Sequence, residues 1–80
     1  MTLPKVVLDF LANNAKQANV TQPDADDNLF KIGVLDSFNV VDLVSILEEE
    51  CGIEVPDVDV NATNFQSIKA IVHYVESQKG

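Results

Sequence analysis

The sequence predicts an all-α fold, a small four-helix bundle of three longer helices and one short helix, with a long loop between helices 1 and 2. Three segments carry apolar residues at helical spacing, and start or stop signals flank them. Between the first two segments, residues 18–36 lose that periodicity and collect Pro23, Gly33 and four aspartates. Eighty residues support one modest core, so we expect residues 1–80 to form a single domain.

The first helix is predicted over residues 3–17. Pro4 suits its first turn, where the missing N–H of proline costs nothing. The predicted buried face consists of apolar residues at helical spacing: Leu3, Val7, Phe10 and Leu11.

Residues 18–36 form a connection that is unusually long for a compact domain. Long loops in small proteins tend to be functional or pinned to the core. Pinning is favoured here, because a solvated loop has no need of large apolar side chains. The predicted anchors are Leu29, Phe30, Ile32, Val34 and Leu35.

The second helix is predicted over Ser37–Cys51 and has the clearest pattern in the chain. Gly52 follows it in the position where a left-handed residue ends a helix. Ser37 or Asp36 stands where the residue that caps the first turn is expected. Five apolar residues form the predicted buried stripe: Val40, Leu43, Val44, Leu47 and Cys51.

The last helix follows an irregular stretch over residues 53–65, in which residues 56–60 can form a short helical turn. Thr63 and Gln66 have the spacing of a capping box, which predicts that the last helix starts there. We expect it to end near Glu76. Its predicted buried stripe is Ile68, Ile71, Val72 and Val75.

The net charge of -8 is large for this size and limits the possible partners. All but Asp9 and Glu76 of the 13 acidic residues lie between Asp24 and Asp59, where Lys31 is the only basic residue. Such a field argues against binding to nucleic acid and to an anionic membrane surface, and it favours basic protein surfaces as partners. The simpler alternative is that the charge only keeps a small protein in solution.

The expected compartment is the cytoplasm. A single cysteine cannot form an internal disulfide, and the N-terminal segment has a helical pattern rather than that of a signal peptide. No apolar run approaches the length that spans a membrane.

We find no residue set for a metal ion or for autonomous catalysis. Residues 57–61 imitate the start of a calcium loop, but the glycine and glutamate needed later are Ala62 and Ile68. One cysteine and one histidine cannot build a zinc site. Cys51 continues a buried stripe and His73 lies away from the apolar side of the last helix, so both are expected to be structural.

Ser37 has three interpretations. A nucleophile would need a neighbouring base and an oxyanion hole, and the only histidine is His73, 36 residues further along. A helix cap is favoured by the local sequence alone. The third interpretation is a serine modified by another enzyme, because a phosphate at a helix N-terminus would face free N–H groups and the positive end of the dipole.

One face of the second helix is predicted to dock a partner. Asn39, Asp42 and Glu49 share this face, and Ile46 lies among them as an apolar spot ringed by carboxylates. Ser45 lies between the acidic and the apolar sides. A plain solvated side would have no such apolar spot.

Two stretches resemble the acyl carrier proteins, whose hallmark is Asp-Ser-Leu within a Gly-x-x-Asp-Ser segment. They are "GVLDSF" at residues 33–38 and "EEECGIEVPD" at residues 48–57. The similarity covers nearly the whole chain: first helix, long loop, serine-led second helix, connection and final helix. The resemblance therefore agrees with the predicted fold.

The resemblance implies that Ser37 carries 4′-phosphopantetheine through a phosphodiester, installed from coenzyme A by a phosphopantetheinyl transferase. The thiol of that arm would hold acyl or aminoacyl groups as thioesters for partner enzymes. Asp36 matches the acidic residue before the serine, and Phe38 takes the place of the leucine, so both are expected at the cofactor site. The protein itself would be a carrier and not an enzyme.

The resemblance also assigns the docking face. Asp42 and Glu49 fall where the family presents carboxylates to basic patches of its enzymes, with Ser45 and Ile46 between them. The expected partners are the transferase, an acyl or aminoacyl ligase, and downstream synthase or transferase enzymes. We expect the carrier to be a monomer.

Two residues depart from the pattern of housekeeping fatty-acid carriers. Phe38 replaces leucine, and Asn39 stands where those carriers usually have an acid. "FKIGVLDSF" and "NFQSIKAI" are more similar to specialised free-standing carriers, such as D-alanyl, aminoacyl or polyketide carriers. Two rivals of other classes are an unmodified acidic adaptor in which Ser37 only caps a helix, and a small hydrolase built on Ser37.

Overall fold

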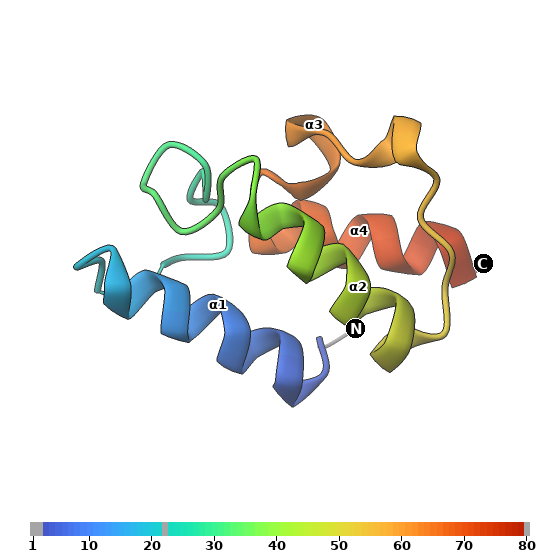
Figure 1. Cartoon of the computed structure of the whole chain (residues 1–80), viewed down its shortest axis with the longest axis horizontal. Helices are drawn as coiled ribbons and strands as arrows, with labels where there is room; N and C mark the ends of the chain where they lie inside the picture. Colours follow the sequence, from blue (N-terminus) through green and yellow to red (C-terminus); the bar gives the residue numbers. More distant parts are fainter. Residues whose placement is uncertain (1–2, 22, 80) are drawn as a thin grey trace.

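The computed structural model describes residues 3–21 and 23–79, and within these ranges the chain is all-helical without strands. Three longer helices are α1 (Lys5–Gln17), α2 (Asn39–Cys51) and α4 (Ile68–Lys79). The short elements are a 3-10 turn, η1 (Asp57–Asp59), and a single turn of α-helix, α3 (Ala62–Phe65). Figure 1 shows α1 and α2 side by side, with α4 behind α2 and α3 above it. The predicted small helical bundle is confirmed.

The core of the bundle contains the predicted stripes of α1 and α2. Leu3, Val7 and Leu11 are buried, and Phe10 is half-buried against the core. All five residues of the predicted α2 stripe are buried as well. Gly52 ends α2 in the left-handed conformation, with φ of 66°, as its position predicts.

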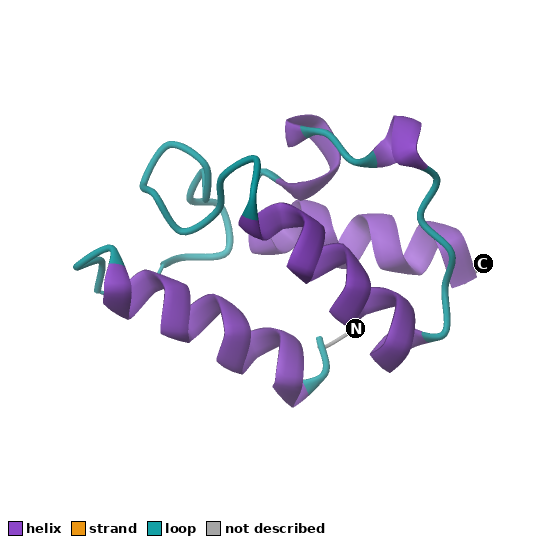
Figure 2. Ribbon diagram, viewed as in Figure 1, coloured by secondary structure: helices purple, strands orange, loops and turns teal. Residues whose placement is uncertain are grey.

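The long loop between α1 and α2 is anchored as its apolar residues predict. Figure 2 shows it curling above the end of α1 before it enters α2. Leu29, Val34 and Leu35 are buried, and Phe30 and Ile32 pack half-buried against the core. Backbone hydrogen bonds tie the loop to the C-terminal half, from Leu29 N to the carbonyl of Gln66 (2.6 Å) and from Lys69 N to that of Ala25 (3.0 Å). The loop that leads into α2 is therefore held both by its buried side chains and by these bonds to the C-terminal half.

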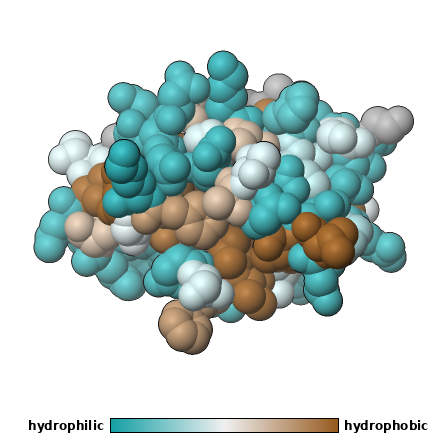
Figure 3. Space-filling view, turned by 90° about the horizontal axis from the view of Figure 1, so that it is seen from above, coloured by the Kyte–Doolittle hydropathy of each residue, from teal (hydrophilic) through white to brown (hydrophobic). Residues whose placement is uncertain are grey.

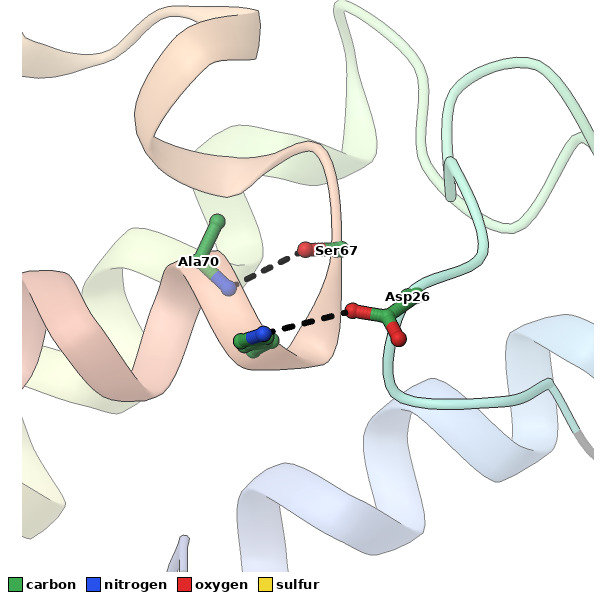
Figure 4. Close-up of polar contacts among 4 residues, drawn as sticks. Asp26, Ser67 and Ala70 are labelled. Carbon is green, nitrogen blue, oxygen red and sulfur yellow. Dashed lines mark hydrogen bonds and ion pairs between the residues drawn. The ribbon is translucent and has the colours of Figure 1, made fainter.

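The start of the last helix differs from the prediction. Asn61, rather than Thr63, caps the short helix α3, because its side chain accepts a hydrogen bond from Asn64 N. The short helix then ends, and α4 starts after Ser67. The hydroxyl of Ser67 accepts a hydrogen bond from Ala70 N at 3.0 Å (Figure 4).

Asp26 of the long loop approaches the same turn and lies 3.8 Å from the ammonium group of Lys69. The predicted end of the helix near Glu76 is also too early, since α4 continues to Lys79.

A buried tyrosine links α4 to the connection after α2, and the sequence pattern did not reveal it. Tyr74 packs against Phe65, with ring centroids 5.2 Å apart, and donates a hydrogen bond of 2.9 Å to Asp59. Burial first, and then this hydrogen bond and the charge of Asp59, raise the pKa of Tyr74 to about 12. A second tie comes from Glu48 of α2, whose carboxylate accepts a hydrogen bond from Val55 N.

Candidate attachment site

The first turn of α2 is capped by Asp36. One carboxylate oxygen of Asp36 accepts hydrogen bonds from the backbone N–H groups of Phe38 and Asn39, both at 2.8 Å. The Asp36 carbonyl accepts a further bond from Val40 N at 3.1 Å. In return, the Asn39 side-chain oxygen accepts from Asp36 N at 2.7 Å. This reciprocal pair has the logic of a capping box, with asparagine in place of the usual glutamate or glutamine.

Ser37 is left exposed at this turn. Within the described part of the chain its hydroxyl makes no hydrogen bond, so it does not serve as the cap. The free N–H groups expected to face a phosphate on Ser37 are also occupied, because Asp36 takes those of Phe38 and Asn39. These two N–H groups are therefore not free for a phosphate on Ser37, and the Asp36 carboxylate that accepts from them would repel its negative charge.

Asn39 is fixed at both ends of its amide. Besides accepting from Asp36 N, it donates a hydrogen bond of 3.1 Å to the carbonyl of Val34. Its side chain is half-buried. Asn39 thus joins the end of the long loop to the start of α2 and presents no charge to a partner.

The remaining residues of the predicted docking face divide into two groups. Asp42, Ser45 and Glu49 are exposed along α2. Ile46 is half-buried and packs against the core, so only part of it is available among the carboxylates. The acidic side of α2 is therefore open to solvent over most of its length.

Three large apolar side chains stay exposed at this end of α2 and in η1. Phe38 is 85% exposed, Val41 is 57% exposed one turn later, and Val58 of η1 is 83% exposed. Figure 3, seen from the side of α3 and η1, shows hydrophobic surface gathered in a band across this face. Sequence reasoning singled out Phe38 but missed Val41 and Val58, because exposed apolar residues are not distinguished by helical periodicity.

The other chemically reactive side chains lie apart from this turn. Cys51 is buried at the end of α2, and His73 is exposed on α4, as their positions in the sequence predict. Among residues 3–21 and 23–79, no group of three or more histidine, cysteine or acidic side chains could hold a metal ion. No helix in this part of the chain is long and apolar enough to cross a membrane.

Comparison with known proteins agrees with this geometry. The model of the family described as "Phosphopantetheine attachment site" matches residues 8–75, which include Ser37 and most of the bundle. An acyl carrier protein of Campylobacter hominis is 43% identical over 58 residues, covering 69% of this chain and 71% of that protein.

Matches to two other bacterial proteins extend further along the chain. An acyl carrier protein of Clostridium perfringens is 32% identical over 73 residues, covering 91% of this chain and 87% of its own. One of Solidesulfovibrio magneticus is 29% identical over 76 residues, covering 95% and 88%.

Carrier proteins of this kind are not catalytic, and they hold a covalent 4′-phosphopantetheine on which other enzymes act. The family model and the Clostridium perfringens relative both cover most of the chain, including the segment around Ser37. This chain therefore belongs to the acyl carrier protein family, the phosphopantetheine-binding carrier proteins.

Proposed function

We propose that Ser37 is the attachment residue and that the loaded arm carries acyl or aminoacyl groups between partner enzymes. The observation that carries this proposal is an exposed hydroxyl with no hydrogen-bond partner among the residues that the structure describes, held at the first turn of a helix whose start is fixed by other residues. When bound, the arm supplies a terminal thiol that holds the cargo as a thioester. The chain positions the arm and presents the surface by which enzymes find it.

The residues around Ser37 fit this role. The Ser37 hydroxyl is the acceptor of the phosphopantetheinyl group, and the transferase supplies the base that the chain lacks. Asp36 and Asn39 hold the turn through reciprocal hydrogen bonds, so the serine is presented in one backbone geometry. The cap that an unmodified adaptor would require from Ser37 is provided by Asp36, which removes the main support for that rival.

The cargo class is proposed to be that of a specialised pathway. Phe38 places a large, 85% exposed ring directly after the serine, where it would contact the enzyme that loads or unloads the arm. Asn39 stands in place of an acidic residue that would present a negative charge to partners, and its side chain donates a hydrogen bond to the long loop instead. These features favour an acyl or aminoacyl ligase and a downstream synthase or transferase as partners. The lone cysteine, with no disulfide partner, supports the cytoplasm as the proposed compartment.

A transfer assay tests the attachment. We expect incubation with coenzyme A and a promiscuous phosphopantetheinyl transferase to add one phosphopantetheine mass to the wild-type chain and none to Ser37→Ala. Ser77→Ala is the matched control, since Ser77 is also an exposed helical serine, on α4 and away from the docking face, and its loss should leave the modification intact. Failure of several such transferases to modify the wild-type chain would contradict the proposal.

The rate at which the transferase modifies the chain should depend on the charges of the docking face. We expect Asp42→Lys or Glu49→Lys to slow modification, because basic partner surfaces lose an attractive carboxylate and meet a new positive charge. The difference should shrink at high salt, where exposed charges are screened. Asp9→Lys on α1 changes the net charge equally and should have less effect. Equal slowing by all three variants would show that only net charge matters.

A further inference from the structure

A small polar hollow lies beside the proposed attachment residue. It has a volume of about 180 Å³ and lies between the end of α1, the end of the long loop and the start of α2. Asp36, the chain neighbour of Ser37, forms part of its wall. The lining residues are Asn14, Gln17, Ala18, Gly33, Asp36 and Asn39.

Two residues of α1 that carry carboxamides, Asn14 and Gln17, line this hollow. The side-chain nitrogen of Asn14 is buried and has no hydrogen-bond partner among residues 3–21 and 23–79. Gln17 follows three residues later, so it shares a side of the helix with Asn14, and its exposed side chain makes no hydrogen bond in the described part of the chain. Asn39 across the hollow differs, because both ends of its amide are already bonded.

A buried amide N–H group without an acceptor is unusual in a folded protein and calls for an explanation. No hydrogen bond from the described part of the chain holds the Asn14 amide nitrogen in its present orientation. Turning it toward the hollow therefore breaks no bond, and a ligand with a carbonyl or hydroxyl oxygen there would satisfy it. The site is thus suited to a ligand that offers neutral polar groups.

We propose that this hollow receives the hydroxyl and amide groups of the phosphopantetheine arm, with Asn14 and Gln17 as their hydrogen-bond partners. The inference rests on the proposed attachment at Ser37. Carboxamides both donate and accept, and so match an arm that contains a hydroxyl and secondary amides. The Asp36 carboxylate in the wall disfavours the phosphate itself.

The size and polarity of the hollow restrict what can occupy it. Its volume corresponds to about six water molecules at roughly 30 Å³ each, enough for a few polar groups of the arm but not for a long acyl chain. The middle of the arm then rests against α1 for part of the time, and a partner enzyme must draw it out. Asn14 and Gln17 act as positioning residues for the arm.

Nuclear magnetic resonance of the modified chain tests the inference. The ¹⁵N-labelled protein is first converted with coenzyme A, and the mass is checked. We expect the side-chain amide signals of Asn14 and Gln17 to shift on conversion and to show Overhauser contacts with arm protons. The side-chain amide of Asn13, exposed on the same helix, should stay unchanged.

Exchange of the amide protons of the arm gives a second readout. In the wild type these protons should exchange more slowly than in free coenzyme A, and Asn14→Ala should reduce that protection by roughly 2- to 10-fold, the value of one hydrogen bond. Gln17→Ala, at an exposed position, should act in the same direction without risk to the fold. Asn13→Ala is the matched control and should leave the protection unchanged.

The outcomes separate the two proposals. Absence of the mass increase on Ser37 contradicts the attachment itself. A complete mass increase with unshifted Asn14 and Gln17 signals, and arm amides that exchange as fast as in coenzyme A, would show that the hollow holds only water. That result overturns the inference and leaves the attachment intact.

Discussion

Replacing Asp36 with alanine tests which residue caps α2. Asp36 accepts two backbone hydrogen bonds of 2.8 Å at the first turn, whereas the Ser37 hydroxyl accepts none. We therefore expect Asp36→Ala to destabilise the unmodified protein and Ser37→Ala to leave it nearly unchanged. The comparison decides between Ser37 as a structural cap and Ser37 as a free attachment residue.

The magnitude follows from the bonds that are lost. Removing an N-cap side chain costs about 0.5–2 kcal/mol, and loss of a negative charge at the helix N-terminus adds about 0.3–1 kcal/mol. The total, about 1–3 kcal/mol, is a large part of the roughly 4–12 kcal/mol expected for a chain of 80 residues. The melting temperature should fall by about 4–8 °C for each kcal/mol lost.

Urea unfolding followed by circular dichroism measures these differences in free energy of unfolding. Asp36→Asn is the matched variant, because asparagine keeps an oxygen acceptor and loses only the charge, at a cost below about 1 kcal/mol. Ser37→Ala should stay within about 0.5 kcal/mol of the wild type. A loss above 1 kcal/mol in Ser37→Ala, with Asp36→Ala near zero, would refute the capping scheme.

Three further predictions concern the fold. Tyr74→Phe should cost about 1–2 kcal/mol in urea unfolding, since it removes the hydrogen bond to Asp59. The folded-state pKa of Tyr74 is raised from 10 to about 12, so the stability that the neutral tyrosine contributes is complete below pH 10 and is lost as the pH rises toward 12. Ultraviolet titration of this single tyrosine checks the raised pKa, and a midpoint near 10 would contradict it. In thermal unfolding, Ser67→Ala should lower the free energy of unfolding by about 1 kcal/mol, and Thr63→Ala should leave it nearly unchanged. A larger loss in Thr63→Ala than in Ser67→Ala would instead support the capping box predicted from the sequence. Leu29→Ala, at a fully buried loop anchor, should cost about 2–5 kcal/mol by the same measurement, and a loss below 1 kcal/mol would show that the loop is not pinned there.

The parts of the fold that follow from periodicity were predictable. The stripe from Val40 to Cys51 repeats at helical spacing, and a helix of that pattern has one way to bury it. Gly52 ended that helix as predicted, because few other residues adopt a left-handed conformation cheaply. The loop anchors followed from the same reasoning, since large apolar side chains in a small protein must contribute to its only core.

The start of α4 was not predictable from local signals alone. Asn61, Thr63 and Ser67 are all good capping residues, and two of them cap separate helices. The choice depends on tertiary contacts, since the loop bonds Leu29 N to the carbonyl of Gln66 at the junction between α3 and α4. Capping preferences cannot anticipate a hydrogen bond to a segment that lies nearly 40 residues away.

At the proposed attachment site, too, local signals could not decide which residue caps the helix. Asp36 and Ser37 are adjacent, and either side chain is a good cap, so only the backbone path decides which one accepts the first-turn N–H groups. The sequence showed that Asn39 stands where related carriers have an acidic residue. It could not show that the Asn39 side chain donates a hydrogen bond to the carbonyl of Val34 in the loop. The burial of the Asn14 amide nitrogen, and its lack of a partner among the described residues, result from tertiary packing and could not be predicted from the local sequence.

The turn proposed to carry the arm is held by its own hydrogen bonds, and its surroundings are left open. Hydrogen bonds from both directions link the backbone on either side of Ser37, while the hydroxyl and the ring of Phe38 face solvent. If Ser37 is modified as we propose, the modifying enzyme meets a preorganised turn and spends little free energy on ordering it.

Peptide mapping of the protein purified from its own host shows most directly whether Ser37 carries the arm. We expect a phosphopantetheine mass on the peptide that contains Ser37, on that residue alone, with part of the population carrying an acyl or aminoacyl group on the thiol. A chain that carries no such mass, or carries it on a residue other than Ser37, would show that Ser37 is not the attachment residue.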